Sequence, residues 1–151
     1  MTQELREAAV VIREFRMADY DRVMEIWTEG RLPLKPRGRD SRSNIEAQIG
    51  RPNVHFLVAE AEGRVVGTVV ATHDGRKGWI NRLAVDESCR KGGLGRRLVL
   101  EAERRLAGEG MEIFACLIED WNEASMEVFG RLGYRKHPEI LYFTKRLDPD
   151  V

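Results

Sequence analysis

Residues 90–97 combine glycines with basic side chains in a pattern suited to binding phosphate. Glycine lets the backbone approach an anion closely and tolerates positive φ. The first N–H groups of a helix have no partner inside it, and the helix dipole adds partial positive charge there. A tight turn with solvated cations is the alternative, but a strand-to-helix context favours an anion site, most simply for a diphosphate. The residues concerned are Arg90, Lys91, Gly92, Gly93, Leu94, Gly95, Arg96 and Arg97.

The flanking residues predict the strand and the helix that this loop requires. Trp79–Val85 is a short apolar run, which is typical of a buried strand. Leucine and alanine then recur at steps of four from Leu94 to Leu106, which predicts a helix with one apolar face. Polar residues 86–91 connect the two. The glycines are therefore expected where the chain passes from a strand into a helix.

Two common phosphate-binding loops do not fit this stretch. A P-loop requires Lys followed by Ser or Thr after its last glycine, whereas Gly95 is followed by Arg96. A dinucleotide-binding loop requires a small residue three positions after Gly95, and that position is Leu98. The motif Arg90-x-x-Gly93-x-Gly95 remains to be explained.

The N-terminal half is predicted to contribute two helices and a hairpin. Asp19 is a plausible N-cap for the first helix. Ser43 and Glu46 have the spacing of a capping box, which would begin a short second helix. The turn signal Asp74-Gly75 predicts that the strand after it folds back antiparallel. The polar residues Met1–Ala9 could form a helical arm, and the expected strands are Val10–Phe15, His55–Glu60 and Arg64–Thr72.

The C-terminal part is predicted to return to the sheet. Met111–Ile118 is an expected strand, parallel to Trp79–Val85 because a helix connects them. Asn122 is a good N-cap for a further helix, which Gly133 would end as the C′ residue. Short strands at Tyr134 and at Ile140–Lys145 would complete the order β α α β β β α β α β β.

Two segments resemble conserved motifs of the GNAT superfamily of N-acetyltransferases. Arg90-x-x-Gly93-x-Gly95 is similar to the loop that binds the acyl-CoA pyrophosphate in that family. Asn122-x-x-Ser125-x-x-x-Phe129-x-x-x-Gly133-Tyr134 is similar to the family's Asn-x-x-Ala-x-x-x-Tyr-x-x-x-Gly-Phe/Tyr segment. The resemblance implies the α/β (α+β) GNAT fold in a single domain over residues 1–151. That fold has a mixed central sheet of about six to seven strands flanked by four helices.

The resemblance also implies where acetyl-CoA, the expected co-substrate, would bind. In the family, the strand that matches Trp79–Val85 is bulged, and acetyl-CoA lies in the gap between it and the next parallel strand. A backbone N–H freed by the bulge would face the thioester carbonyl and stabilise the oxyanion. The residues implied for acetyl-CoA are Leu83, Ala84, Val85, Arg90, Lys91, Gly92, Gly93, Leu94, Gly95, Arg96, Asn122, Ser125 and Phe129.

The attacking amine needs a base, because an amine with a pKa of about 10 is mostly protonated at neutral pH. The sequence leaves four candidates open: water next to Asn81, His73, Glu119 and Asp120. Glu119 and Asp120 follow the C-terminal end of a predicted strand, where open α/β sheets place ligands. His73 precedes Asp74-Gly75 and is as well explained as a turn residue.

One departure from the family motif concerns the leaving thiolate. The family tyrosine lies near the thioester sulfur and can protonate the thiolate, but Phe129 stands in its place. A phenyl ring cannot donate a proton. Tyr134 and Tyr142 are candidate acids by residue type only.

The resulting hypothesis is an acetyl-CoA-dependent N-acetyltransferase. It would transfer an acetyl group to a primary amine, on a small molecule or a peptide N-terminus, by direct attack in a ternary complex. A non-catalytic acyl-CoA-binding or regulatory module is the alternative that Phe129 suggests, and a regulator that binds another diphosphate is a third. The basic loop 30–42 is either a lip over the acceptor site or a solvated loop.

Composition limits the partners and the compartment. A chain of 151 residues with a net charge of +0 gives no general argument for binding nucleic acid or membranes. Cys89 and Cys116 lack paired-motif spacing, so free thiols in the cytoplasm are expected. The three histidines show no metal-ligand spacing, so no metal is expected. A homodimer is implied only by the resemblance.

Overall fold

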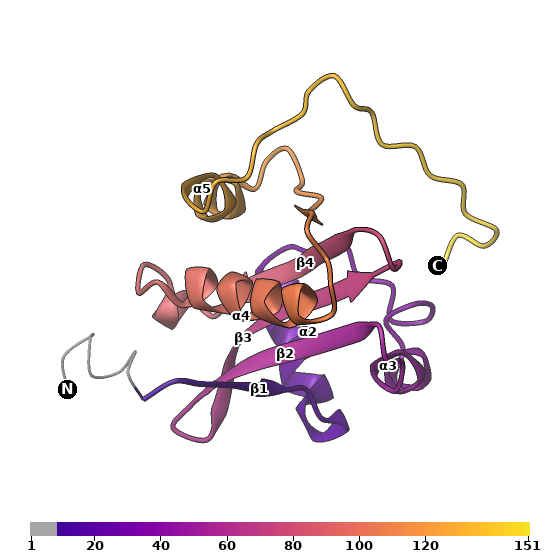
Figure 1. Cartoon of the computed structure of the whole chain (residues 1–151). Helices are drawn as coiled ribbons and strands as arrows, with labels where there is room; N and C mark the ends of the chain where they lie inside the picture. The colour runs from indigo at the N-terminus through magenta and orange to yellow at the C-terminus, as the bar shows by residue number, and fades with distance from the viewer. Residues whose placement is uncertain (1–8) are drawn as a thin grey trace.

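A five-stranded mixed sheet forms the centre of the protein in a computed structural model that describes residues 9–151 (Figure 1). The strands lie in chain order, β1 to β4 pair antiparallel, and β5 pairs parallel to β4. The predicted arm Met1–Ala9 lies, apart from Ala9, outside the described residues. The strands are β1 (Val11–Glu14), β2 (Val54–Ala61), β3 (Arg64–His73), β4 (Gly78–Val85) and β5 (Phe114–Ala115).

Helices cover both faces of this sheet (Figure 1). Alternate residues of β2 and β3 point to opposite faces, so that Leu57 and Val69 pack with α4 residues while Val58 and Val70 pack with Trp27 of α2. Two apolar cores result, one on each side. The helices are α2 (Tyr20–Glu29), α3 (Arg42–Ile49), α4 (Leu94–Gly108) and α5 (Glu123–Arg131), with short 3-10 turns η1 (Met17–Asp19) and η2 (Glu87–Cys89).

The predicted order of elements is confirmed as far as α5. Asp19 and Asn122 stand at the N-cap positions of α2 and α5, and the Asn122 side chain accepts a hydrogen bond from Ser125 N–H. Gly133 follows α5 with a φ of 93°, as expected for a C′ residue. The capping box at Ser43 is wrong. Ser41 caps α3 instead, because it has the extended backbone that an N-cap needs, with φ −67° and ψ 157°.

The last predicted strands do not form, which is why the described sheet has five strands rather than six or seven. Tyr134 and Ile140–Lys145 lie in extended chain without strand pairing. β5 is also shorter than the predicted Met111–Ile118, because its pairing with β4 ends at Trp79 and Ala115. An apolar run predicts a tendency to form a strand, but a strand forms only where the tertiary structure brings the run against the edge of a sheet.

A bulge interrupts the pairing of β3 with β4. The register shifts between Thr68 and Val70, and Arg82 on β4 takes a left-handed φ of 57°. The Thr68 side chain is fully buried at this point. Its hydroxyl accepts from Trp27 Nε1 at 2.9 Å and donates to the Arg82 carbonyl at 2.9 Å. The bulge that the family resemblance implies is therefore present, and a buried hydroxyl holds it in place.

Replacing Thr68 by Val should remove both hydrogen bonds and leave an indole N–H and a carbonyl buried without partners. We expect a loss of about 1–3 kcal/mol in the free energy of unfolding, measured by urea denaturation. Thr72→Val, on the same strand but only partly buried, is the matched control and should change it by less than about 0.5 kcal/mol. Equal effects of the two substitutions would contradict this role for Thr68.

Candidate functional site

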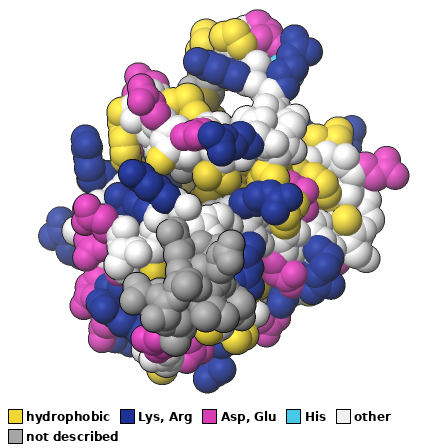
Figure 2. All heavy atoms as spheres, turned by 90° about the vertical axis from the view of Figure 1, so that its left-hand side faces the viewer, with side chains coloured by type: hydrophobic (Ala, Val, Ile, Leu, Met, Phe, Trp, Pro, Cys, Tyr) yellow, Lys and Arg dark blue, Asp and Glu magenta, His cyan; other side chains and the backbone are white. Residues whose placement is uncertain are grey.

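A cleft of about 820 Å³ opens between the end of β4, the loop before α4 and the start of α5. Figure 2 looks onto the side of the molecule that holds this loop and shows Lys and Arg side chains around a band of hydrophobic surface. Most of the residues predicted to bind acetyl-CoA come together here. They are Leu83, Ala84, Val85, Arg90, Lys91, Gly93, Leu94, Gly95, Arg96, Asn122 and Ser125.

The backbone of the loop turns sharply just before α4. Lys91 and Gly93 have left-handed φ values of 72° and 78°, and α4 begins at Leu94 without a side-chain cap. A Cβ built on Gly93 would meet no atom within 4 Å. The N-terminal N–H groups of α4 thus begin beside open space at the cleft, which is the arrangement that an anion requires.

The basic residues of the loop lie between the cleft and a neighbouring hollow. Arg90, Lys91 and Arg96 line the cleft, Arg90 and Lys91 line the hollow as well, and Arg90 Nε also donates to the Val85 carbonyl at 3.1 Å. Arg97 turns away and donates to the Val10 carbonyl. Gly92 lines this hollow of about 790 Å³, together with Arg97. Arg90, Lys91 and Arg96 add positive charge where α4 begins.

β4 separates from its parallel neighbour next to the cleft. Pairing with β5 stops after Trp79, and the Asn81 side chain bridges the widening gap by accepting from Leu117 N–H at 3.1 Å. Beyond the bulge at Arg82, the backbone of Leu83–Val85 forms one wall of the cleft. Asn81, a predicted catalytic residue, is thus seen to hold the two diverging segments together.

α5 forms the opposite wall. Asn122 uses its Oδ1 to cap the helix, so its amide NH₂ is the group that can donate to a ligand. Ser125 and Val128 line the cleft, whereas Phe129 is only 3% exposed and packs edge-on against Tyr134. The structure therefore places Phe129 in the core rather than among the described residues that line the cleft.

Three of the predicted candidates for the general acid or base lie outside the cleft. Glu119 and Asp120 are exposed in the turn before α5, and Tyr142 is 71% exposed in the C-terminal segment. None of the three is among the described residues that line the cleft.

Tyr134, a candidate acid, and His73, a candidate base, both make hydrogen bonds to residues outside the cleft. Tyr134 donates its hydroxyl to Glu103 at 2.7 Å, and burial together with this carboxylate raises the pKa of Tyr134. His73 accepts from Gly75 N–H at Nδ1 and contacts Glu109 at the C-terminal end of α4. A helix of 15 residues spans about 22 Å, so His73 lies far from the start of α4.

The mouth of the cleft carries residues that the sequence did not single out. Glu29 and Gly30 at the end of α2 line it, and Arg31 stacks 4.6 Å from the ring centre of Trp121. Arg31 is the part of the predicted basic lip that reaches the cleft. The stacking gives Trp121 a defined place in the lining of the cleft.

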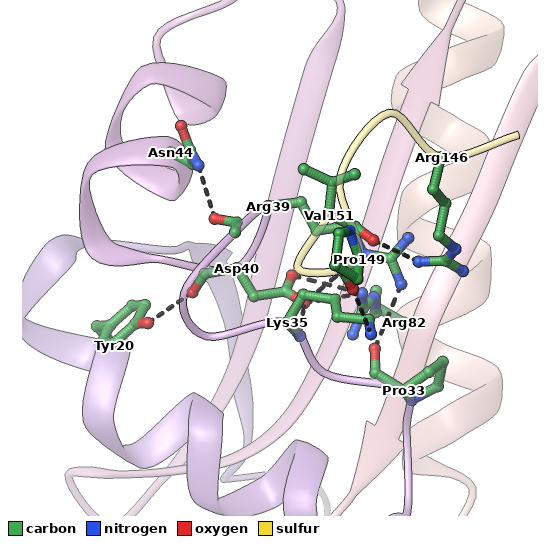
Figure 3. A network of polar contacts seen from close by, with 11 residues as sticks. Tyr20, Pro33, Lys35, Arg39, Asp40, Asn44, Arg82, Arg146, Pro149 and Val151 are labelled. Atoms are coloured by element: carbon green, nitrogen blue, oxygen red, sulfur yellow. Dashed lines mark hydrogen bonds and ion pairs between the residues drawn. The ribbon is translucent and has the colours of Figure 1, made fainter.

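The rest of the basic loop is fixed from within by Asp40 (Figure 3). This carboxylate is buried, accepts from Lys35 N–H at 2.8 Å and pairs with Arg82 Nη2 at 3.3 Å. The Arg82 guanidinium also stacks 4.7 Å from the ring centre of Trp27, and burial lowers its pKa. Asp40 is the one acid among five basic residues in loop 30–42, and sequence reasoning missed its role as the internal anchor of this loop.

Comparison with known proteins identifies the family. The profile of the acetyltransferase (GNAT) family matches residues 20–134, which is most of the chain. The chain belongs to the GNAT family of acetyltransferases. An acetyltransferase of Photorhabdus laumondii is 32% identical over 140 residues, which cover 92% of this chain and 96% of the relative. The predicted family and enzyme class are thereby confirmed.

Solved structures share the fold at low sequence identity. An aminoglycoside acetyltransferase from an uncultured soil metagenomic sample, in complex with sisomicin, has a TM-score of 0.75 at 13% identity. The match covers 94% of this GNAT chain and 99% of that one. An N-acetyltransferase from Thermoplasma acidophilum, in complex with coenzyme A, has a TM-score of 0.71 at 19% identity, covering 83% and 89%. Of the described helices, none is long and apolar enough to cross a membrane.

The free energy of unfolding of this GNAT protein should depend on pH through Asp86, the first residue of the loop between β4 and α4. Hydrogen bonds from Ser88 and the Arg22 guanidinium lower the pKa of Asp86 from the ordinary value of an aspartate to about 2. A lowered pKa stabilises the fold above pH 4, and that contribution is lost as the pH falls toward 2.

We therefore predict that Asp86→Asn lowers the unfolding free energy at pH 7 and flattens its fall between pH 4 and pH 2. Urea denaturation at several pH values would measure both. Asp21→Asn, at an exposed carboxylate, is the control. An unchanged slope in the Asp86 variant would contradict the assignment.

Proposed function

We propose that this GNAT protein uses acetyl-CoA as the acetyl donor and a primary amine as the acceptor. The observation that carries this proposal is the single cleft that joins the bulged strand end, the glycine–arginine loop and the start of α5. A donor with a diphosphate at one end and a thioester at the other matches such a cleft. The coenzyme A complex of the Thermoplasma acidophilum enzyme, which has the same fold, supports the choice of donor.

The diphosphate would lie at the N-terminus of α4. Backbone N–H groups beyond Gly93 provide donors, and Arg90, Lys91 and Arg96 supply compensating charge. Gly93 is required for two reasons: its φ is left-handed, and any side chain would project toward the anion. Asn122 would hold the pantetheine arm through its amide NH₂.

The thioester would lie along Leu83–Val85, beyond the bulge. The thioester supplies an electrophilic carbonyl and a thiolate leaving group, and backbone N–H groups of the strand end would stabilise the oxyanion. The amine would enter past Arg31 and Trp121, where the Glu29 carboxylate favours a cationic substrate before deprotonation. Water beside the cleft would then accept the proton of the amine.

The leaving thiolate needs no protein acid in this arrangement. Phe129 is buried and has no ionisable group, and Tyr134 has its hydroxyl on Glu103. Thiols ionise with a pKa of about 8.5, so a thiolate is a stable leaving group near neutral pH. Direct attack in a ternary complex is thus compatible with phenylalanine at this position.

A panel of amines incubated with acetyl-CoA tests the function, with released thiol as the measurement. The panel should contain polyamines, amino acids, aminoglycosides and peptides with free N-termini. Turnover with at least one class is expected, together with acetyl-CoA binding in isothermal titration. Tight binding without turnover on any amine would instead support a non-catalytic acyl-CoA module. Binding of ATP or NAD with no binding of acetyl-CoA would support the nucleotide regulator.

Gly93→Glu should abolish acetyl-CoA binding, because it adds bulk and negative charge at the diphosphate position. Gly63→Glu is a closely matched control. Gly63 also has a left-handed φ, 75°, with open space around it, but it lies in the turn between β2 and β3. We expect the two variants to lose similar stability and only the Gly93 variant to lose affinity by about 100-fold or more. Unchanged affinity would remove the loop assignment.

A further inference from the structure

The guanidinium of Arg82 has donors that no group in the described part of the chain uses. Its Nη1 atom is buried and has no hydrogen-bond partner among the described residues. Its Nη2 atom reaches the two Asp40 oxygens only at 3.3 and 3.4 Å, whereas arginine and carboxylate typically approach to about 2.7–2.9 Å. Asp40 makes its short bond, of 2.8 Å, to the Lys35 N–H instead. A buried cation with unused donors is unfavourable unless a further acceptor completes its contacts.

Positive charge exceeds negative charge around this guanidinium. Arg39 Nε lies 3.8 Å from the Asp40 carboxylate, and Lys35 contacts the same carboxylate through its backbone N–H. Asp40 is the one acid of loop 30–42. A single carboxylate therefore stands among three basic residues, and this excess of charge favours the binding of a second anion.

Residues 148–151 of the chain itself lie on this basic loop (Figure 3). Lys35 Nζ donates to the Pro149 carbonyl at 3.1 Å, and Arg37 Nη2 pairs with Asp150 Oδ1 at 3.5 Å. The two side chains of this ion pair are 85% and 51% exposed, so the pair contributes little to stability. The loop thus already binds acceptor oxygens, and the segment that carries them is held weakly enough to be displaced.

Arg82 lies beside the strand end proposed to hold the thioester, on the face of the sheet that α2 covers. It directly precedes Leu83 in β4, and its guanidinium stacks 4.7 Å from the ring centre of Trp27 in α2. Three residues further along, a Cβ built on Gly30 would lie 3.8 Å from the Cβ of Ala84. The end of α2 therefore runs over this part of β4, and a ligand group at Arg82 would be close to the reacting atoms.

Two side chains of opposite charge could hold opposite ends of one acceptor. Glu29 lines the cleft near the end of α2 and attracts an ammonium group. Arg82 attracts an anion, and the planar fork formed by its Nη1 and Nη2 atoms matches the two oxygens of a carboxylate. A polyamine would bring a second cation to Arg82 and be repelled there. The arrangement suits an amine that carries a carboxylate, as an amino acid does.

We propose that Arg82 and Lys35 form a subsite for a carboxylate on the acceptor amine, and that residues 148–151 occupy Lys35 until this carboxylate displaces them. The inference rests on the proposed function and deepens it, because it names the class of acceptor. On displacement, Lys35 Nζ exchanges the neutral Pro149 carbonyl for a carboxylate, which makes a stronger charge-assisted bond. The segment gives up only an exposed ion pair.

Alanine and alaninamide as matched acceptors test the subsite, because the amide keeps the amine and lacks the negative charge. With acetyl-CoA, thiol release by the wild type should give a kcat/KM at least about tenfold higher for alanine. Arg82→Gln should remove this preference by raising the KM for alanine, while kcat/KM for the amide stays within about twofold. Lys35→Gln should weaken the preference too, and it serves as the test if Arg82→Gln does not fold. Arg51→Gln, at an exposed position after α3, is the control and should keep the preference.

Deletion of residues 148–151 tests the displacement. Without the competing segment, the KM for alanine should fall by about threefold or more, because the binding-competent state is then fully populated. The KM for alaninamide should not change. An unchanged KM for alanine would overturn the role given to this segment.

Binding of N-acetylalanine separates the subsite from the proposed function, because calorimetry of this product requires no turnover. The wild type should bind it at least about tenfold more tightly than N-acetylalaninamide, and Arg82→Gln should abolish the difference. Equal binding and equal use of acid and amide by the wild type would overturn the subsite, even with amines being acetylated. A preference that survives in both Arg82→Gln and Lys35→Gln would overturn it as well. Selective binding of N-acetylalanine without turnover of any amine would support the subsite and contradict the proposed function.

Discussion

The fold and its cleft depend on the buried contact of Thr68 with the Arg82 carbonyl. β4 pairs with β3 along most of its length but with β5 over only two residues, which a regular straight strand could not easily combine. It stays paired with β3 as part of the sheet, and it separates from β5 where the cleft opens. The bulge at Arg82 permits both because it changes the direction of β4 without losing β3. The buried side chains of Thr68 and Trp27 hold the bulge in place through their hydrogen bonds. The packing of the core therefore determines the shape of the cleft.

In the cleft, backbone groups rather than ionisable side chains provide most of the contacts proposed for the substrates. The lining includes Gly93, Gly95 and the backbone of Leu83–Val85, which suits recognition of a diphosphate and a thioester by N–H groups. The ionisable side chains expected to carry out proton transfer lie outside it or are engaged in structural contacts, as with Tyr134 and Glu103. Positioning of the two substrates, rather than a protein acid, is therefore the main source of rate enhancement in the proposed mechanism.

The sheet is well covered at its centre and open at one edge. α2 and α3 on one face and α4 on the other bury β2 and β3 almost completely, whereas β5 is short and its flanking residues are exposed. The same chain carries an apolar segment beyond α5 with no cover of its own.

The sequence by itself determined the elements whose signals are local. Glycine spacing, the step of four from Leu94 and the Asp74-Gly75 turn predicted the loop, α4 and the hairpin, because backbone conformation and one apolar face suffice for them. The cap at Asn122 is local too. Only the tertiary structure decided the rest. The bulge at Arg82, the burial of Phe129 and the engagement of Asn81 with Leu117 depend on residues distant in the sequence. The segment 140–147 has the pattern of a strand, but strand formation requires an edge to pair with, and a local pattern does not contain that edge.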